Sequence, residues 1–172
     1  AIREEPDNLD YQAALEKAKK EGAKFYYAKA AKILESPDIT LENLQEAISE
    51  LQKAIDLSPD DLLIVDAVQR SLDDKRSLEV MIDSHFRKGL EEGNNRRWEE
   101  ALREYEVALK MNPSSVRIRA KVEEAKDSLA LDHYNSAISF QKEEKWEEAI
   151  SEFEKVLGVR PDHPGALREL ER

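Results

Sequence analysis

The sequence contains no cysteine, and it has only five glycines and six prolines in 172 residues. The lack of cysteine excludes disulfide frameworks, thiolate metal sites and cysteine nucleophiles, and it leaves the compartment open between cytoplasm and periplasm. The scarcity of turn-forming residues argues against an all-β fold. No run approaches the ~20 apolar residues of a membrane span, and residues 1–6 do not have the pattern of a signal peptide.

Basic residues are also in short supply, with 27 lysines and arginines against 38 aspartates and glutamates and a net charge of −11. A surface of this sign repels nucleic-acid phosphates and anionic lipids. We therefore expect no nucleic-acid partner and no membrane insertion. The acidic side chains are expected to solvate the outer faces of helices, because Ala, Leu, Glu and Lys dominate the composition.

One pattern occurs twice in the second half of the chain. Residues 85–90 (HFRKGL) lead to Trp98 and EEAL, and residues 133–138 (HYNSAI) lead to Trp146 and EEAI. Each copy ends in a proline, and a weaker copy ends at Pro59. A repeated unit normally supplies surface for partners, whereas catalysis needs different groups that converge on one point. The repetition therefore predicts a protein that is not an enzyme.

Apolar residues recur at helical spacing along the whole chain, and no stretch alternates as a strand would. The pattern over residues 9–35 weakens at Gly22, which predicts two helices or one bent helix. Thr40 is the expected N-cap of an amphipathic helix over 41–57, and Asn43 lacks the acid of a full capping box. Continuous helices are expected over 60–92 and 115–143, with shorter return helices over 98–111 and 146–157. The residues after His163 have the pattern of the start of a further helix, and the sequence has no initial Met. Together these two features predict that the sequence is a piece of a longer protein.

These residues resemble the tetratricopeptide repeat. In that repeat the first helix carries an aromatic residue and, three positions later, a small residue. The return helix carries alanine, an aromatic residue and a second alanine, and it is followed by proline. Two units match well, and their positions are Phe86, Gly89, Trp98, Ala101, Tyr105, Ala108 and Pro113, then Tyr134, Ala137, Trp146, Ala149, Phe153, Val156 and Pro161. The first unit matches through Phe25, Ala28, Leu44, Ala47, Leu51 and Ala54 only if about seven residues around 36–40 are inserted. The resemblance implies an all-α, right-handed solenoid of antiparallel helical hairpins.

The expected organisation has five segments. They are an N-terminal helical segment (1–22), a degenerate hairpin with an insertion (23–59), two extended hairpins (60–113 and 114–161), and the start of a further or capping helix (162–172). Successive closing prolines lie 54 and 48 residues apart, whereas the family period is about 34. The surplus should lengthen each first helix by roughly 30 and 21 Å. We expect the added apolar faces to pack on one another, on the N-terminal helix or on another chain.

The conspicuous side chains have structural interpretations. The small residues Ala28, Gly89, Ala137, Ala101 and Ala149 are expected at close helix crossings, and Trp98 and Trp146 are expected to be largely buried within their own units. His85 and His133 occupy equivalent positions, which indicates a shared structural role rather than a metal site. Glu99-Glu100 and Glu147-Glu148 suit the first turn of a helix. We expect no catalytic residue, no metal and no cofactor.

The resemblance implies a groove lined by the first helices that receives a peptide or a helix of another protein. By position the groove residues are Phe25, Phe86, Leu90, Tyr134, Ile138, Lys29, Asn94, Gln141 and Lys142. Equally, the long helices could cover the aromatic residues and make them part of the core. The family's carboxylate clamp is not expected, because Phe86 and Leu90 stand where it needs polar side chains. The predicted function is a protein-interaction scaffold; the alternatives are a self-assembling structural protein and a regulatory fragment of a larger enzyme or assembly machine.

Overall fold

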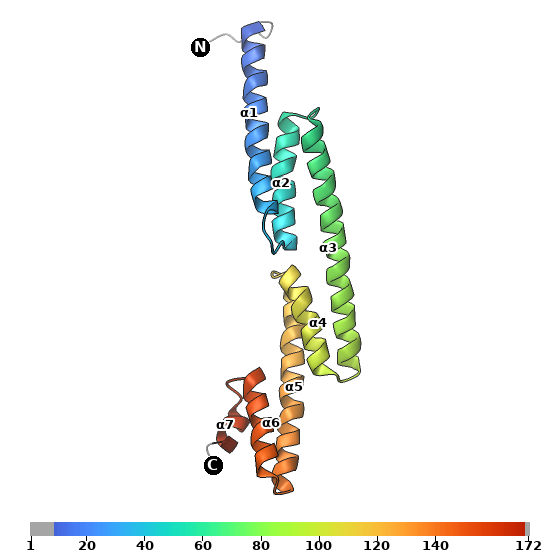
Figure 1. The fold of residues 1–172 in the computed structure, drawn as a ribbon, viewed down its shortest axis with the longest axis vertical. Helices are drawn as coiled ribbons and strands as arrows, with labels where there is room; N and C mark the ends of the chain where they lie inside the picture. Colours follow the sequence, from blue (N-terminus) through green and yellow to red (C-terminus); the bar gives the residue numbers. More distant parts are fainter. Residues whose placement is uncertain (1–8, 171–172) are drawn as a thin grey trace. The chain divides into compact units, whose positions relative to one another are not determined.

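The computed structural model describes residues 9–170, and every regular element in that range is an α-helix (Figure 1). The helices are α1 (Leu9–Leu34), α2 (Leu41–Leu57), α3 (Leu62–Asn94), α4 (Trp98–Met111), α5 (Val116–Lys142), α6 (Trp146–Val159) and α7 (Pro164–Leu170). The all-α class predicted from the sequence is confirmed. None of the helices between residues 9 and 170 is long and apolar enough to span a membrane.

The chain divides into two compact units, and the boundary between them lies within α3, between Val80 and Met81. The expected helices over 60–92 and 115–143 are each continuous, as α3 and α5. Neither contains proline, and good helix formers fill the interval between the two apolar stretches of α3. The expected segment 1–22 lies partly outside the described residues, and its remainder is the beginning of α1.

The first unit is built on the hairpin of α1 and α2, against which the first turns of α3 pack. One cluster joins Ala30, Ala47 and Leu51 to the partly buried Ala67 and Val68 of α3. A second cluster joins Ala23, Ala54 and Ile64. Helix α1 is uninterrupted at Gly22, so the alternative of two helices is wrong. Gly22 instead allows the end of α2 to approach, because an added Cβ would lie 2.9 Å from Leu57 Cδ1.

The register expected for this hairpin is wrong by two residues. Ala28 is exposed, whereas Ala30 is completely buried beside Ala47. The small residue of the helix crossing is therefore Ala30, and the neighbouring aromatic at the matching spacing is Tyr27 rather than Phe25. This register makes the insertion between the two helices shorter than the sequence comparison assumed.

Thr40 caps α2 as expected, but the capping box is complete without an acid. The Thr40 hydroxyl accepts a hydrogen bond from the Asn43 N–H at 3.2 Å, and the Asn43 amide oxygen accepts one from the Thr40 N–H at 3.0 Å. An amide oxygen is an acceptor like a carboxylate oxygen, so asparagine closes the box. The start of α2 is fixed at Leu41 in this way.

The second unit contains the end of α3 and the helices α4 to α7. Gly89 lies against Tyr105, and the rings of Phe86 and Tyr105 are 5.6 Å apart. The first half of α5 packs on α4, and its second half packs on α6 through Ala130, Ala137, Ala149 and Phe153. Ala101 and Ala149 are buried, as expected from the sequence.

The lengthened first helices therefore contact the return helix of the preceding hairpin. The added turns of α5 lie on α4, where Ile118, Val122 and Ala125 are buried, and those of α3 lie on the α1–α2 hairpin. The sequence predicted that the added apolar faces pack on one another, on the N-terminal helix or on another chain, and none of these three alternatives describes the packing in full. The added turns extend the contact between successive hairpins and cover part of their apolar surface, whereas Leu62, Leu63 and Val116 remain exposed.

Candidate partner-binding surfaces

A hollow of about 370 Å³, called here the inner groove, lies between α1, the α1–α2 loop and α3. Its lining residues are Tyr27, Leu34, Ile39, Leu63, Asp66, Ala67, Arg70, Ser71 and Asp74. Leu63 is 73 % exposed and Tyr27 is 37 % exposed, whereas Ser71 is buried. The groove thus lies between the first helices of two successive hairpins and offers apolar side chains to solvent.

The rim of the inner groove carries two aspartates and one arginine. Asp66 and Arg70 form an ion pair one helical turn apart on α3, and both side chains remain more than half exposed. Asp74 lies one further turn along the same helix. Exposed pairs of this kind contribute little to stability, so Asp66 and Arg70 can exchange partners at small cost when another chain arrives.

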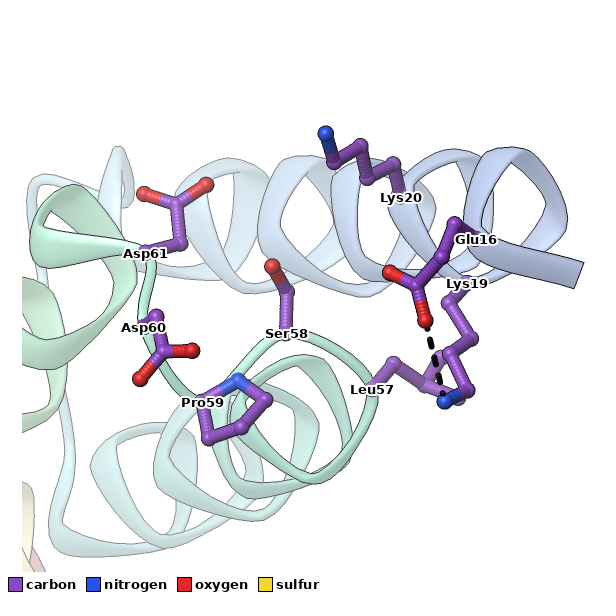
Figure 2. A pocket seen from close by; sticks show the side chains of 8 residues that line it. All are labelled: Glu16, Lys19, Lys20, Leu57, Ser58, Pro59, Asp60 and Asp61. Carbon is purple, nitrogen blue, oxygen red and sulfur yellow. Dashed lines mark hydrogen bonds and ion pairs between the residues drawn. The ribbon is translucent and has the colours of Figure 1, made fainter. Parts of the chain in front are cut away.

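A second hollow, of about 560 Å³, lies between α1 and the turn that joins α2 to α3 (Figure 2). Glu16, Lys19 and Lys20 of α1 face Leu57, Ser58, Pro59, Asp60 and Asp61. Lys19 pairs with Glu16 at 3.4 Å, and the Asp61 carboxylate accepts a hydrogen bond from the Leu63 N–H at 3.0 Å. Charges of both signs compensate one another here, and Asp61 already has a structural role at the start of α3.

A third hollow, of about 500 Å³, lies in the second unit and is called here the terminal groove. Its lining residues are Gln141, Trp146, Ala149, Ile150, Phe153, Glu169 and Leu170. Trp146 is 57 % exposed and Ile150 is 48 % exposed. The expectation that both tryptophans are largely buried is therefore wrong for Trp146, whereas Trp98 is half-buried near Gly93.

The nine predicted partner-binding residues do not gather in one place. Phe86 is only 5 % exposed, between Tyr105 and the guanidinium of Arg117, 4.4 Å from the ring centre. Tyr134 is half-buried against Phe153 and His163. The alternative that the helices make these two aromatics part of the core describes the structure better.

The remaining seven predicted residues differ in their surroundings. Leu90 and Ile138 are half-buried, and Phe25, Asn94 and Lys142 are exposed. Lys29 donates to Glu50 at 2.9 Å across the α1–α2 hairpin. Gln141 donates to Glu169 at 3.1 Å, and it alone of the nine lines one of the three hollows described above.

Glu50 is a buried carboxylate that sequence reasoning missed. Its Oε1 accepts hydrogen bonds from Lys53 at 2.8 Å and from Lys29 at 2.9 Å, and these two bonds lower its pKa. The same contact raises the pKa of Lys29. Lys29 thus joins the two helices of the first hairpin.

The equivalent histidines of the two repeats have equivalent partners, which supports their shared structural role. His85 Nδ1 lies 2.6 Å from the Glu104 carboxylate, and His133 Nδ1 lies 2.6 Å from that of Glu152. The hydrogen bond with His85 lowers the pKa of Glu104. Each pair joins a first helix to its return helix. Among residues 9–170 no group of three or more His, Asp or Glu side chains is placed to hold a metal ion.

The geometry of the described residues defines a class of protein: successive antiparallel hairpins of α-helices, two of whose hollows expose apolar side chains. The family model of the tetratricopeptide repeat matches residues 39–61, which comprise α2 and its flanking turns. This match supports, over that segment, the resemblance to the tetratricopeptide repeat that the sequence indicated.

No curated protein matches the chain. Among solved structures, it is similar to the crystal structure of YrrB, described as a TPR protein with an unusual peptide-binding site. The sequences are 16 % identical, the match covers 94 % of this chain and 98 % of that one, and the TM-score is 0.27.

Proposed function

We propose that this chain is a non-catalytic protein-interaction scaffold, and that the inner groove binds apolar side chains of a peptide or helix from another protein. The observation that carries the proposal is Leu63, which is 73 % exposed beside Tyr27 and above the half-buried Leu34 and Ala67. Burial of such a leucine by a partner contributes about 1.5–3 kcal/mol. Leu63 and Tyr27 are therefore the expected energetic centre of the contact.

The charges around the groove favour a partner that is not strongly acidic. Asp66 and Asp74 border the apolar surface together with the single arginine Arg70, in a chain of net charge −11. A neutral or basic peptide meets less repulsion there than an acidic peptide or a nucleic acid. Since the apolar contact dominates, the affinity should change little with salt.

The experiment begins with selection of binding peptides from a phage-displayed random library against the intact chain. Fluorescence anisotropy then measures each labelled peptide against the parent and against Leu63→Asp. We expect at least about tenfold weaker binding, because about 1.4 kcal/mol of lost contact changes an equilibrium constant tenfold. Val80→Asp is the matched control: Val80 is also an exposed residue of α3 (65 %), and it does not line the groove.

Circular dichroism must show that both variants retain the helical signal of the parent. Peptides that bind Leu63→Asp as tightly as the parent would place the binding site elsewhere and refute the proposal. A selection that yields no peptide above background would refute it as well.

A further inference from the structure

The wall that α3 contributes to the inner groove is apolar at one end and charged at the other. Leu63, Ala67, Arg70 and Asp74 are successively four, three and four residues apart, so they lie in one stripe along the helix. Leu63 is 73 % exposed, and Arg70 and Asp74 are exposed as well. A peptide in the groove therefore meets an apolar surface first and charges further along, which gives the groove a direction.

The charge of Asp74 is not compensated by a partner. This carboxylate is exposed, and among residues 9–170 it has neither an ion-pair nor a hydrogen-bond partner. Arg70 lies one helical turn from Asp66 and one turn from Asp74, and it pairs with Asp66. The two aspartates and the single arginine leave an excess of negative charge at this end of the groove. The free carboxylate therefore favours a cationic group on the ligand.

A buried hydroxyl lies close to this carboxylate. Ser71 lines the inner groove and is only 2 % exposed, and its hydroxyl makes no hydrogen bond to any residue between 9 and 170. Buried polar groups normally have a partner, and a ligand can supply the missing one. Ser71 precedes Asp74 by three residues, so the two side chains are neighbours on the helix surface. Their oxygens together suit lysine or arginine, whose charged groups donate several hydrogen bonds.

The dimensions of the groove fit an extended segment. Leu63 and Asp74 are eleven residues apart, which is about 16 Å along a helix. An extended chain covers this length with about five residues, at roughly 3.3 Å for each. The hollow, of about 370 Å³, is smaller than one turn of an α-helix, which fills roughly 400 Å³ at a diameter of about 10 Å.

We propose that the inner groove selects an extended peptide segment in which an apolar residue contacts Leu63 and a lysine or arginine, about five residues away, binds Asp74 beside Ser71. This inference rests on the proposed function, and it adds the charge, the spacing and the direction of the ligand. The apolar residue supplies the larger part of the affinity, because an ion pair at a half-open surface contributes less than a buried leucine. The basic residue selects among apolar peptides.

The first experiment repeats the selection from the phage-displayed random library against three proteins: the parent, Asp74→Lys and Asp73→Lys. Asp73 is the matched control, because it is the exposed neighbour of Asp74, undergoes the same change of charge and does not line the groove. Peptides from the parent and from Asp73→Lys should share a basic residue about five positions from an apolar one. Peptides from Asp74→Lys should retain the apolar residue and lose the basic one.

The second experiment is a double-mutant cycle measured by fluorescence anisotropy. One partner is a selected peptide, with its basic residue intact or replaced by the neutral norleucine, and the other is the parent or Asp74→Asn. Each single change should weaken binding by about two- to fivefold, and both together should weaken it no further than one alone. Asp73→Asn should leave the difference between the two peptides unchanged. High salt should reduce that difference.

Circular dichroism must show that each aspartate variant retains the helical signal of the parent. Additive effects of the two changes, or the same loss of the basic residue in the Asp73→Lys selection, would overturn the inference. So would a basic residue at no constant spacing, or at a spacing of about eleven, which indicates a helical ligand.

The inference and the proposed function can fail separately. Peptides that lose affinity for Leu63→Asp but show no coupling to Asp74 would support the proposed function and refute the inference. Peptides that bind Leu63→Asp as tightly as the parent would refute the proposed function, and the inference with it.

Discussion

Two helical glycines of the second unit should have opposite effects on the free energy of unfolding when each is replaced by alanine. At Gly89 of α3, an added Cβ would lie 2.4 and 2.5 Å from two carbons of the Tyr105 ring. Real Cβ atoms do not approach other heavy atoms this closely, so the ring or the helix must move. Tyr105 is only 4 % exposed, and its ring also packs against the ring of Phe86. At Gly158 of α6, nothing lies within 4 Å of the added atom.

The magnitudes follow from two competing effects. Replacement of glycine by alanine inside a helix contributes about 0.8–1 kcal/mol of stability. Overpacking of a filled core costs about 1–3 kcal/mol, and more where the neighbour cannot yield. Gly89→Ala should therefore lower the free energy of unfolding by up to about 2 kcal/mol, since the clash exceeds the helix propensity. Gly158→Ala should raise it by about 0.5–1 kcal/mol, because only the propensity changes.

Urea unfolding followed by circular dichroism measures both variants against the parent under one set of conditions. The two midpoints should move in opposite directions. If Gly89→Ala proved as stable as Gly158→Ala, the close contact between α3 and Tyr105 would be wrong, and with it the alignment of this hairpin.

Four further predictions concern other contacts. Ala149→Leu should destabilise the chain by about 1–3 kcal/mol through overpacking at the α5–α6 crossing, whereas Ala120→Leu, on an exposed position of α5, should not; equal urea midpoints would contradict the assigned crossing. Glu144→Gly should be neutral or stabilise by up to about 1 kcal/mol, because Glu144 has a φ of 59° that glycine adopts freely; a clear loss of stability would refute this account of the turn. The pKa of Glu104 is lowered in the folded state, so this carboxylate contributes stability that is complete above its ordinary pKa of 4.5 and is lost as the pH falls through the folded value. In urea titrations from neutral to acid pH, Glu104→Gln should therefore lose less stability than the parent. Identical pH profiles for the two proteins would exclude this contribution. Zinc should leave the melting temperature unchanged, because residues 9–170 offer no cluster of three ligands; a rise that His85→Ala abolishes would contradict the structural role of that histidine.

Much of the fold can be predicted from local sequence signals at the ends of the helices. The helices α4 and α5 begin and end within a residue or two of their expected limits, because Trp98, Asn112-Pro113 and Ser115 mark these boundaries. The Ser115 hydroxyl accepts a hydrogen bond from the Ile118 N–H, as an N-cap should. Such signals depend on neighbouring residues alone.

The register of the first hairpin could not be obtained in this way. In the two clear repeats, the small residue of the first helix precedes the first alanine of the return helix by 12 residues, as Gly89 precedes Ala101 and Ala137 precedes Ala149. In the first hairpin, Ala30 precedes Ala47 by 17 residues, so the loop contains five extra residues. Ala28 fits the local pattern equally well with seven. The choice between them depends on which alanine meets α2, a contact that no local spacing specifies.

The binding surfaces were missed for a related reason. Position in a repeat predicts which side chains face the next helix, but exposure depends on how far that helix extends. Phe86 and Tyr134 hold groove positions in the family pattern, yet the first is buried beneath Arg117 and the second lies against Phe153 and His163. Trp146 occupies the same position in its repeat as Trp98, yet it is 57 % exposed, whereas Trp98 is half-buried. In a chain of lengthened repeats, equivalent side chains therefore become core or surface according to the helices that pack on them, which position in the repeat alone does not specify.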